Sequence, residues 1–124
     1  MFISSSDYDS LAAKNVLHMI GERSENNFFD KVTSIHPLAK YTRIIEINKS
    51  HNLHEFGFDC LPFGLKYKFL RFIYAPIYLI IAIIKARKII KKNNISIVRA
   101  SDPYFSAVVG YFSSIGTKIK FVIS

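Results

Sequence analysis

The sequence has very few of the residues that build disulfides and cysteine-rich metal sites. Cys60 is the single cysteine among 124 residues. One cysteine cannot form an internal disulfide or supply a cysteine-rich metal site, so we expect a reduced, cytoplasmic setting. Residues 1–4 have no basic region ahead of an apolar stretch and therefore do not resemble a signal peptide.

Acidic residues are scarce in the second half of the chain. Residues 1–60 contain eight acids and six bases, a net charge of −2, whereas residues 61–124 contain one acid and eleven bases, a net charge of +10. This asymmetry indicates an anionic partner for the second half, or a basic face that serves only solubility. We do not expect nucleic acid as that partner, because zinc-finger spacing, an aromatic RNA-binding strand and an arginine-rich stripe are all missing.

The last third of the chain predicts a strand, a helix and a second strand. Residues 95–100 are rich in β-branched side chains, residues 104–115 carry apolar side chains at helical spacing, and residues 118–123 form another apolar run. A strand, a crossover helix and a strand form a right-handed parallel unit. We therefore expect an α/β fold with a Rossmann-like parallel sheet and helices on both faces. The expected organisation is a single domain over residues 1–124, incomplete at its C-terminus.

The first half of the chain has less regular patterns. They predict a strand at residues 1–4, a helix at residues 10–20 closed by Gly21, and strands at residues 31–36 and 43–48. Residues 49–64 contain Asn, His, Gly and Pro without a period, which predicts a long loop.

The most apolar segment, residues 72–84, contains no charged residue and is followed by a basic cluster. Its thirteen residues fall short of the roughly 20 needed to span a bilayer. A buried core helix and a helix in the membrane interface are both compatible with this pattern, and a spanning helix is the least favoured. Pro76 fits either a kink or the first turn of a second helix. The residues predicted to contact an anionic membrane are Lys85, Arg87, Lys88, Lys91 and Lys92.

Residues 89–103 carry a resemblance to a known family. Their sequence, Ile-Ile-Lys-Lys-Asn-Asn-Ile-Ser-Ile-Val-Arg-Ala-Ser-Asp-Pro, resembles the segment of family 4 glycosyltransferases of the two-domain GT-B fold in which a basic helix ends, a strand runs inward and a loop ending in proline follows. The resemblance covers the second half of the chain. Before that it rests on the order of elements and on the start Phe2-Ile3-Ser4-Ser5.

The resemblance implies the N-terminal, acceptor-side domain of a transferase that moves a sugar from a nucleotide-sugar to a lipid-linked or polysaccharide acceptor. Most donor-binding groups of that family lie in a C-terminal domain, so the resemblance implies a missing partner domain and an isolated chain that is inactive. No cofactor is expected besides the donor substrate, and no catalytic residue is assigned. The alternative is a non-catalytic α/β module that docks on anionic membrane, peripherally at its inner face.

The loops after two predicted strands supply the candidate binding residues. Parallel α/β sheets bind ligands at the carboxyl ends of their strands, so the loops after residues 1–4 and 95–100 are expected to face one cleft. The predicted substrate-binding residues are Ser5, Ser6, Asp7, Arg99, Ser101, Asp102 and Tyr104. Arg99 suits a phosphate or carboxylate, and Asp102 can accept hydrogen bonds from sugar hydroxyls. Asp102 ahead of Pro103 is also a standard helix cap, which is the structural alternative.

Histidines offer a weaker signal. His51 and His54 lie three residues apart with Glu55 and Asp59 nearby, but no helix pattern places them on one face. We therefore predict no metal site there. His18 lies on the first predicted helix and is expected to be a packed or surface residue.

Overall fold

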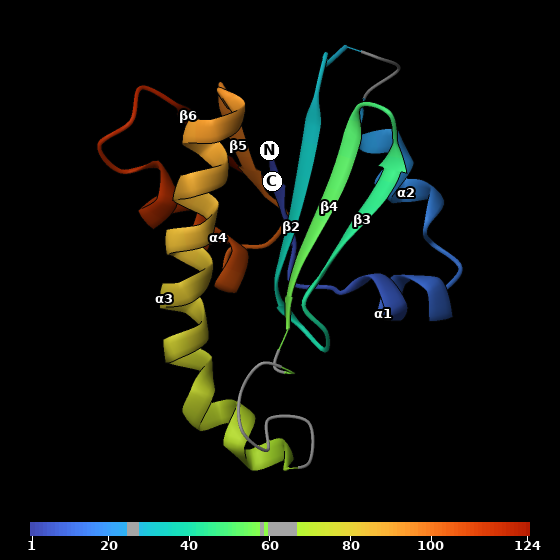
Figure 1. Ribbon diagram of the computed structural model, residues 1–124, viewed down its shortest axis with the longest axis vertical. Coiled ribbons are helices and arrows are strands. Elements are labelled where there is room, and N and C mark those ends of the chain that lie inside the picture. The colour runs from blue at the N-terminus through green and yellow to red at the C-terminus, as the bar shows by residue number, and fades with distance from the viewer. Residues whose placement is uncertain (25–27, 58, 60–66) are drawn as a thin grey trace.

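The computed structural model describes residues 1–24, 28–57, 59 and 67–124, which form an α/β fold around one six-stranded sheet (Figure 1). The strands are β1 (Phe2–Ile3), β2 (Val32–Ala39), β3 (Arg43–Asn48), β4 (His51–Gly57), β5 (Ile97–Ala100) and β6 (Lys120–Ile123). Their order is β3-β4-β2-β1-β5-β6, and among these strands every neighbouring pair is parallel except β3 and β4. The expected Rossmann-like α/β fold is confirmed, with an antiparallel edge strand added.

Helices cover both faces of the sheet, as predicted. The short helices α1 (Tyr8–Ala13), α2 (His18–Gly21) and the 3₁₀ turn η1 (Glu22–Ser24) lie on one side in Figure 1, and α3 (Lys68–Asn93) and α4 (Phe105–Ser114) lie on the other. The β5–α4–β6 unit has the predicted parallel register, which pairs Val98 with Phe121 and Ala100 with Ile123. The connection from β4 to β5 through α3 therefore crosses the face opposite to the connection from β1 to β2.

The first predicted helix is divided into two. Asp7 caps α1, because its carboxylate accepts a hydrogen bond from the backbone N–H of Ser10 at 2.9 Å. Asn15 adopts a left-handed conformation with φ of 55° soon after α1 ends. Asparagine tolerates that conformation better than most residues do, so it ends one helix and redirects the chain into the next.

The prediction of a loop over residues 49–64 is wrong for residues 51–57, which form β4. Asn48 makes the preceding turn by accepting hydrogen bonds from the N–H and the hydroxyl of Ser50. His51, Leu53 and Glu55 lie on one face of β4, and all three are buried. Two of these three are polar, which concealed the period-two pattern of a strand. The other residues of that predicted loop, apart from residues 49, 50 and 59, lie outside the described residues.

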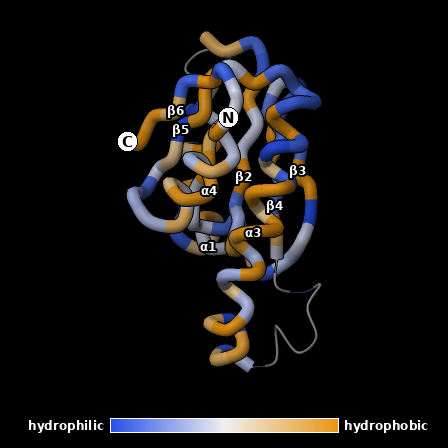
Figure 2. Tube along the Cα trace, turned by 90° about the vertical axis from the view of Figure 1, so that its left-hand side faces the viewer, coloured by the Kyte–Doolittle hydropathy of each residue, from blue (hydrophilic) through white to orange (hydrophobic). Residues whose placement is uncertain are grey.

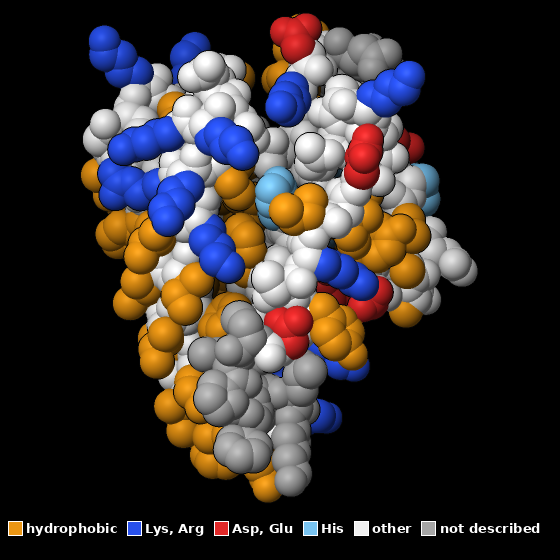
Figure 3. Space-filling view, in the orientation of Figure 1, with side chains coloured by type: hydrophobic (Ala, Val, Ile, Leu, Met, Phe, Trp, Pro, Cys, Tyr) orange, Lys and Arg blue, Asp and Glu red, His pale blue; other side chains and the backbone are white. Residues whose placement is uncertain are grey.

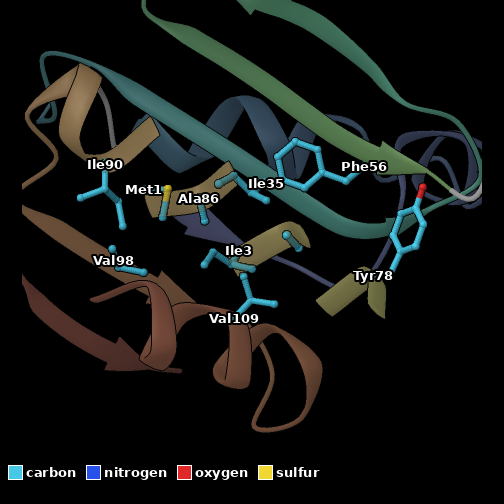
Figure 4. Close-up of a cluster of buried hydrophobic side chains, with 10 residues drawn as sticks. Met1, Ile3, Ile35, Phe56, Tyr78, Ala86, Ile90, Val98 and Val109 are labelled. Atoms are coloured by element: carbon cyan, nitrogen blue, oxygen red, sulfur yellow. The ribbon is translucent and has the colours of Figure 1, made fainter. Parts of the chain in front are cut away.

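The apolar segment forms one long helix, α3, with Pro76 inside it. The interpretation of Pro76 as the start of a second helix is therefore wrong. Tyr78, Ala82, Ala86 and Ile90 recur every fourth residue and are buried against the sheet. Figure 4 shows Tyr78, Ala86 and Ile90 of this row with Ile3, Ile35 and Val98 from three strands and Val109 from α4. Small alanines allow the helix axis to approach the sheet closely, and this cluster is the main apolar core.

The order of the strands reverses at β1, which pairs with β2 on one side and β5 on the other. In open α/β sheets, ligands bind beyond the carboxyl ends of the strands at such a reversal. Residues 4–7 follow β1 and residues 101–104 follow β5. The fold therefore brings the two loops that were predicted to bind substrate to the same edge of the sheet.

Candidate functional site

Backbone hydrogen bonds tie the two loops at this edge to the sheet. The N–H of Ser4 donates to the carbonyl of Ile35 at 3.0 Å. The N–H and the hydroxyl of Ser101 both donate to the carbonyl of Ile3, at 3.0 and 3.1 Å. Ser4 is buried, and its hydroxyl accepts a hydrogen bond from the backbone N–H of Ser6 at 3.4 Å. The site is therefore built on a rigid edge of the sheet.

Asp102 is the carboxylate at the centre of this edge. It accepts hydrogen bonds from the backbone N–H groups of Tyr104 and Ser106, at 3.1 and 3.4 Å, and from the Ser106 hydroxyl. The Ser5 side chain also hydrogen-bonds to it, which joins the loops after β1 and β5. Burial alone would raise the pKa of Asp102, but these hydrogen bonds outweigh burial and hold that pKa below its ordinary value. Asp102 thus accepts from N–H groups at the start of α4, although Tyr104 is the N-cap residue and Pro103 precedes the helix, and it is an ionised acceptor beside Ser5.

Two backbone N–H groups in the first turn of α1 already donate to carboxylates. Asp7 accepts from the Ser10 N–H, and Glu55 accepts from the Tyr8 N–H at 2.5 Å. A phosphate brought to this helix end would meet the carboxylate of Asp7 and N–H groups that already have acceptors, since the charge of Glu55 is balanced by Arg43. The edge therefore suits a neutral ligand that carries hydroxyl groups better than an anion.

Arg99 does not join this group. Its Cα pairs with Phe2 inside the sheet, its guanidinium lies 5.7 Å from the centroid of the Phe2 ring, and its Nε donates to the Ser124 hydroxyl at 2.8 Å. It lines a pocket of about 320 Å³ at the amino ends of β1 and β5, with Phe28 and Phe29. Arg99 lies inside β5, one residue before its end, and its contacts with Phe2 and Ser124 place it apart from Ser5 and Asp102. Tyr104 is 73% exposed at the carboxyl edge.

A buried ion-pair network, which was not predicted from the sequence, lies behind the carboxyl edge. Glu55 is 1% exposed, and its Oε2 accepts from the Arg43 Nε at 2.6 Å. Its Oε1 lies 3.4 Å from the Nδ1 of the buried His36, and Arg43 also pairs with Asp9 at 2.9 Å. Burial would raise the pKa of Glu55, but hydrogen bonds from His36, Tyr8 and Arg43 outweigh it and lower that pKa. Burial lowers the pKa of His36. The network fixes the position of α1 over β2 and β4.

A second buried group connects η1 to the sheet. The Arg23 guanidinium donates to the Ser34 hydroxyl at 2.8 Å, and that hydroxyl lies 2.8 Å from the Nε2 of His51. Burial and the charge of Arg23 lower the pKa of His51 to about 4, and burial lowers the pKa of Arg23 to about 10. The signal that could have found both groups is the alternation of His51, Leu53 and Glu55, read as one face of a strand.

The described residues contain no group of three or more His, Cys, Asp or Glu side chains that could hold a metal ion. His51 and His54 belong to one strand at odd spacing, so they point to opposite faces of the sheet. His18 is an exposed residue of α2. Cys60 lies outside the described residues.

The five basic residues near the end of α3 divide into two groups. The ammonium of Lys85 lies 4.9 Å from the centroid of the Phe56 ring, and Arg87 donates to the Ile115 carbonyl at 2.7 Å. Lys88, Lys91 and Lys92 are exposed. These three exposed lysines are therefore the residues best placed to contact an external anionic surface.

Comparison of the chain with protein-family models, with curated proteins and with solved structures gives no match. The resemblance to family 4 glycosyltransferases therefore stays a prediction, and functional proposals for this chain depend on its own residues.

Proposed function

We propose that this chain is the N-terminal, acceptor-side domain of a GT-B glycosyltransferase, which moves a sugar from a nucleotide-sugar to an acceptor. The observation that supports it most is the edge at the strand reversal between β1 and β5, where Ser5 and Asp102 meet. This is the location at which open α/β sheets bind ligands.

The chemistry of the edge favours an acceptor over a donor. Ionised Asp102 can accept hydrogen bonds from sugar hydroxyls, and exposed Ser5 and Ser101 can both donate and accept. The carboxylate of Asp7 and the N–H groups already bonded to Asp7 and Glu55 at the start of α1 oppose a diphosphate. We accordingly assign the glycan or lipid-linked acceptor to this chain and the nucleotide-sugar to a separate C-terminal domain.

Amide chemical shifts of the isotope-labelled chain test the assignment. Oligosaccharides are expected to shift the amides of Ser5, Ser101 and Asp102, and nucleotide-sugars are not. The Asp102→Asn variant should weaken oligosaccharide binding, whereas Glu46→Gln, which changes an exposed carboxylate on β3, should not. Shifts at this edge with nucleotide-sugars alone, or equal effects of the two variants, would refute it.

A second function is supported by a separate observation. Lys88, Lys91 and Lys92 are exposed at the end of α3, and α3 contains no acidic residue. Each such lysine contributes about 1 kcal/mol near an anionic membrane. We propose docking on the inner face of an anionic membrane, as a property of the transferase or as the whole function of a non-catalytic module. Co-sedimentation tests the docking, and the chain should sediment with anionic vesicles but not with neutral ones. Sugar transfer after addition of a donor domain would identify a transferase, and an absence of transfer would favour the non-catalytic module.

A further inference from the structure

The outer side of the helical layer is strongly apolar. We use the name outer apolar face for the exposed large side chains of α3 and α4 and the residue that follows α4. These are Phe69, Phe72, Ile73, Ile77, Ile80 and Ile84 on α3, and Phe105, Val108, Tyr111, Phe112 and Ile115 at α4. Phe72 is 84% exposed. Soluble monomers rarely expose contiguous apolar patches of this kind, and such patches mark interaction surfaces.

The geometry of α3 separates this face from the core. Ile73, Ile77, Ile80 and Ile84 recur at intervals of three and four residues, on the side opposite to the buried row that begins at Tyr78. Phe72 lies ahead of that row, in the part of α3 that has no buried residue. None of residues 68–77 is buried. Figure 2 shows this first part of α3 extending beyond the end of the sheet. The described strands and helices therefore leave the face uncovered.

Charge identifies what covers the face. The helical row that includes Ile80 and Ile84 continues into Lys88 and Lys91 near the end of α3. Figure 3 shows the basic side chains gathered at one end of this helical layer and the apolar ones along the rest. Neither α3 nor α4 contains an acidic residue. A second copy of the chain would present lysines with no acid on these helices to pair with them, whereas anionic lipid complements both parts of the row.

Topology decides how α3 meets the lipid. It is a helix long and apolar enough to cross a membrane by length and composition. However, Tyr78, Ala82, Ala86 and Ile90 hold it along the sheet, and the strands before and after it, β4 and β5, belong to that same sheet. A helix attached to a sheet in this way cannot place its ends on opposite sides of a bilayer. It can lie in the plane of the interface.

We propose that the outer apolar face inserts into the interface of an anionic membrane, with α3 in the membrane plane. The aromatic and aliphatic side chains reach the boundary of the acyl chains, and Lys88, Lys91 and Lys92 contact the headgroups. This inference rests on the proposed docking and adds insertion of apolar side chains to it. It does not depend on sugar transfer.

Tryptophan fluorescence gives a direct test, because the chain contains no tryptophan. Phe72→Trp places a single reporter on the outer apolar face, and Ile44→Trp places one at a position 70% exposed on β3. The probe is a vesicle of equal parts phosphatidylglycerol and phosphatidylcholine, with or without brominated acyl chains. We expect a blue shift and bromine quenching for Phe72→Trp, and neither for Ile44→Trp.

The depth of two reporters distinguishes insertion in the plane from spanning. Phe72 and Ile84 lie about 18 Å apart along a helix axis. Phe72→Trp and Ile84→Trp should therefore be quenched at similar shallow depths. Depths that differ by about 18 Å would overturn the in-plane arrangement.

Matched lysine variants test the charge. K88Q/K91Q/K92Q and K14Q/K40Q/K49Q both lower the net charge from +8 to +5 (8 − 3). The first should weaken partitioning onto the anionic vesicles by roughly 100-fold and the second by about twofold or less. Equal losses for the two triple variants would overturn the proposal. So would a dimer that forms without lipid and that Phe72→Ser dissociates.

The fluorescence test separates docking from insertion. If Phe72→Trp binds vesicles without a blue shift or quenching, docking remains and insertion is refuted. If it does not bind vesicles, both are refuted.

Discussion

Replacing His51 with glutamine is expected to remove part of the protein's sensitivity to acid. His51 is fully buried in the structure, with its Nε2 on the Ser34 hydroxyl. Its Nδ1 has no hydrogen-bond partner among the described residues. A second proton on the ring would therefore add a buried positive charge without an acceptor, close to the Arg23 guanidinium. Folding keeps the imidazole neutral.

The pKa of His51 gives the size and sign of the effect. It falls from 6.5 to about 4 on folding, first because of burial and then because of Arg23. The unfolded chain therefore binds the extra proton more readily, so the contribution of His51 is complete above pH 6.5 and is lost as the pH falls toward 4. One pKa unit corresponds to about 1.4 kcal/mol, so the loss is about 2 kcal/mol at pH 5 and about 3 kcal/mol below pH 4.

Denaturant unfolding at pH 7 and pH 5 measures this difference. The free energy of unfolding of the native sequence should drop by about 2 kcal/mol more than that of His51→Gln between the two values. The matched control is His18→Gln, which alters an exposed histidine on α2 and leaves the buried contact of His51 with Ser34 in place, so it should not reproduce the effect of His51→Gln. Some slope will persist in His51→Gln, because burial also lowers the pKa values of His36 and His54. Equal slopes for His51→Gln and the native sequence, or a resonance of His51 that titrates near pH 6.5 in the folded protein, would refute the reasoning.

Three further outcomes are expected. Gly57→Ala should cost about 2 kcal/mol of unfolding free energy, because an added Cβ would overlap the backbone of Tyr41; Gly21→Ala, with open space around it, should cost little. Asp102→Ala should cost about 1 kcal/mol in a urea titration through loss of the hydrogen bonds that Asp102 accepts at the start of α4. The isolated chain should transfer no sugar from a panel of nucleotide-sugars, and measurable transfer would contradict the assignment of the donor to another domain.

The fold was predictable where buried strands are apolar and where apolar side chains recur at helical spacing. Residues 95–100 and 118–123 are dominated by apolar and β-branched side chains, and they contain the expected parallel strands β5 and β6. The strand β4 was not predictable in the same way, because burial of His51 and Glu55 is stabilised by partners far away in the sequence. Hydropathy records the cost of burying a polar side chain but not the hydrogen bond that offsets it.

The candidate site was predictable only as far as loops and strand ends determine it. The carboxyl-end rule brought Ser5, Ser101 and Asp102 together correctly. It did not separate Arg99 from them, because Arg99 lies inside β5 and contacts Phe2 and Ser124, which the sequence pattern did not reveal. The buried pair of His36 and Glu55 required knowledge of the β2–β4 register, which places the two residues opposite each other.

The two faces of the sheet are stabilised by different forces, and this difference explains where each proposed function lies. The face under α1 and η1 is held by directional contacts of Glu55, His51 and Arg23. Such contacts fix geometry closely, as an edge that orients an acceptor requires. The face under α3 is held by an apolar row that begins at Tyr78. Apolar packing needs no exact partner geometry, so the outer side of α3 can carry a second apolar row for lipid without disturbing the binding edge.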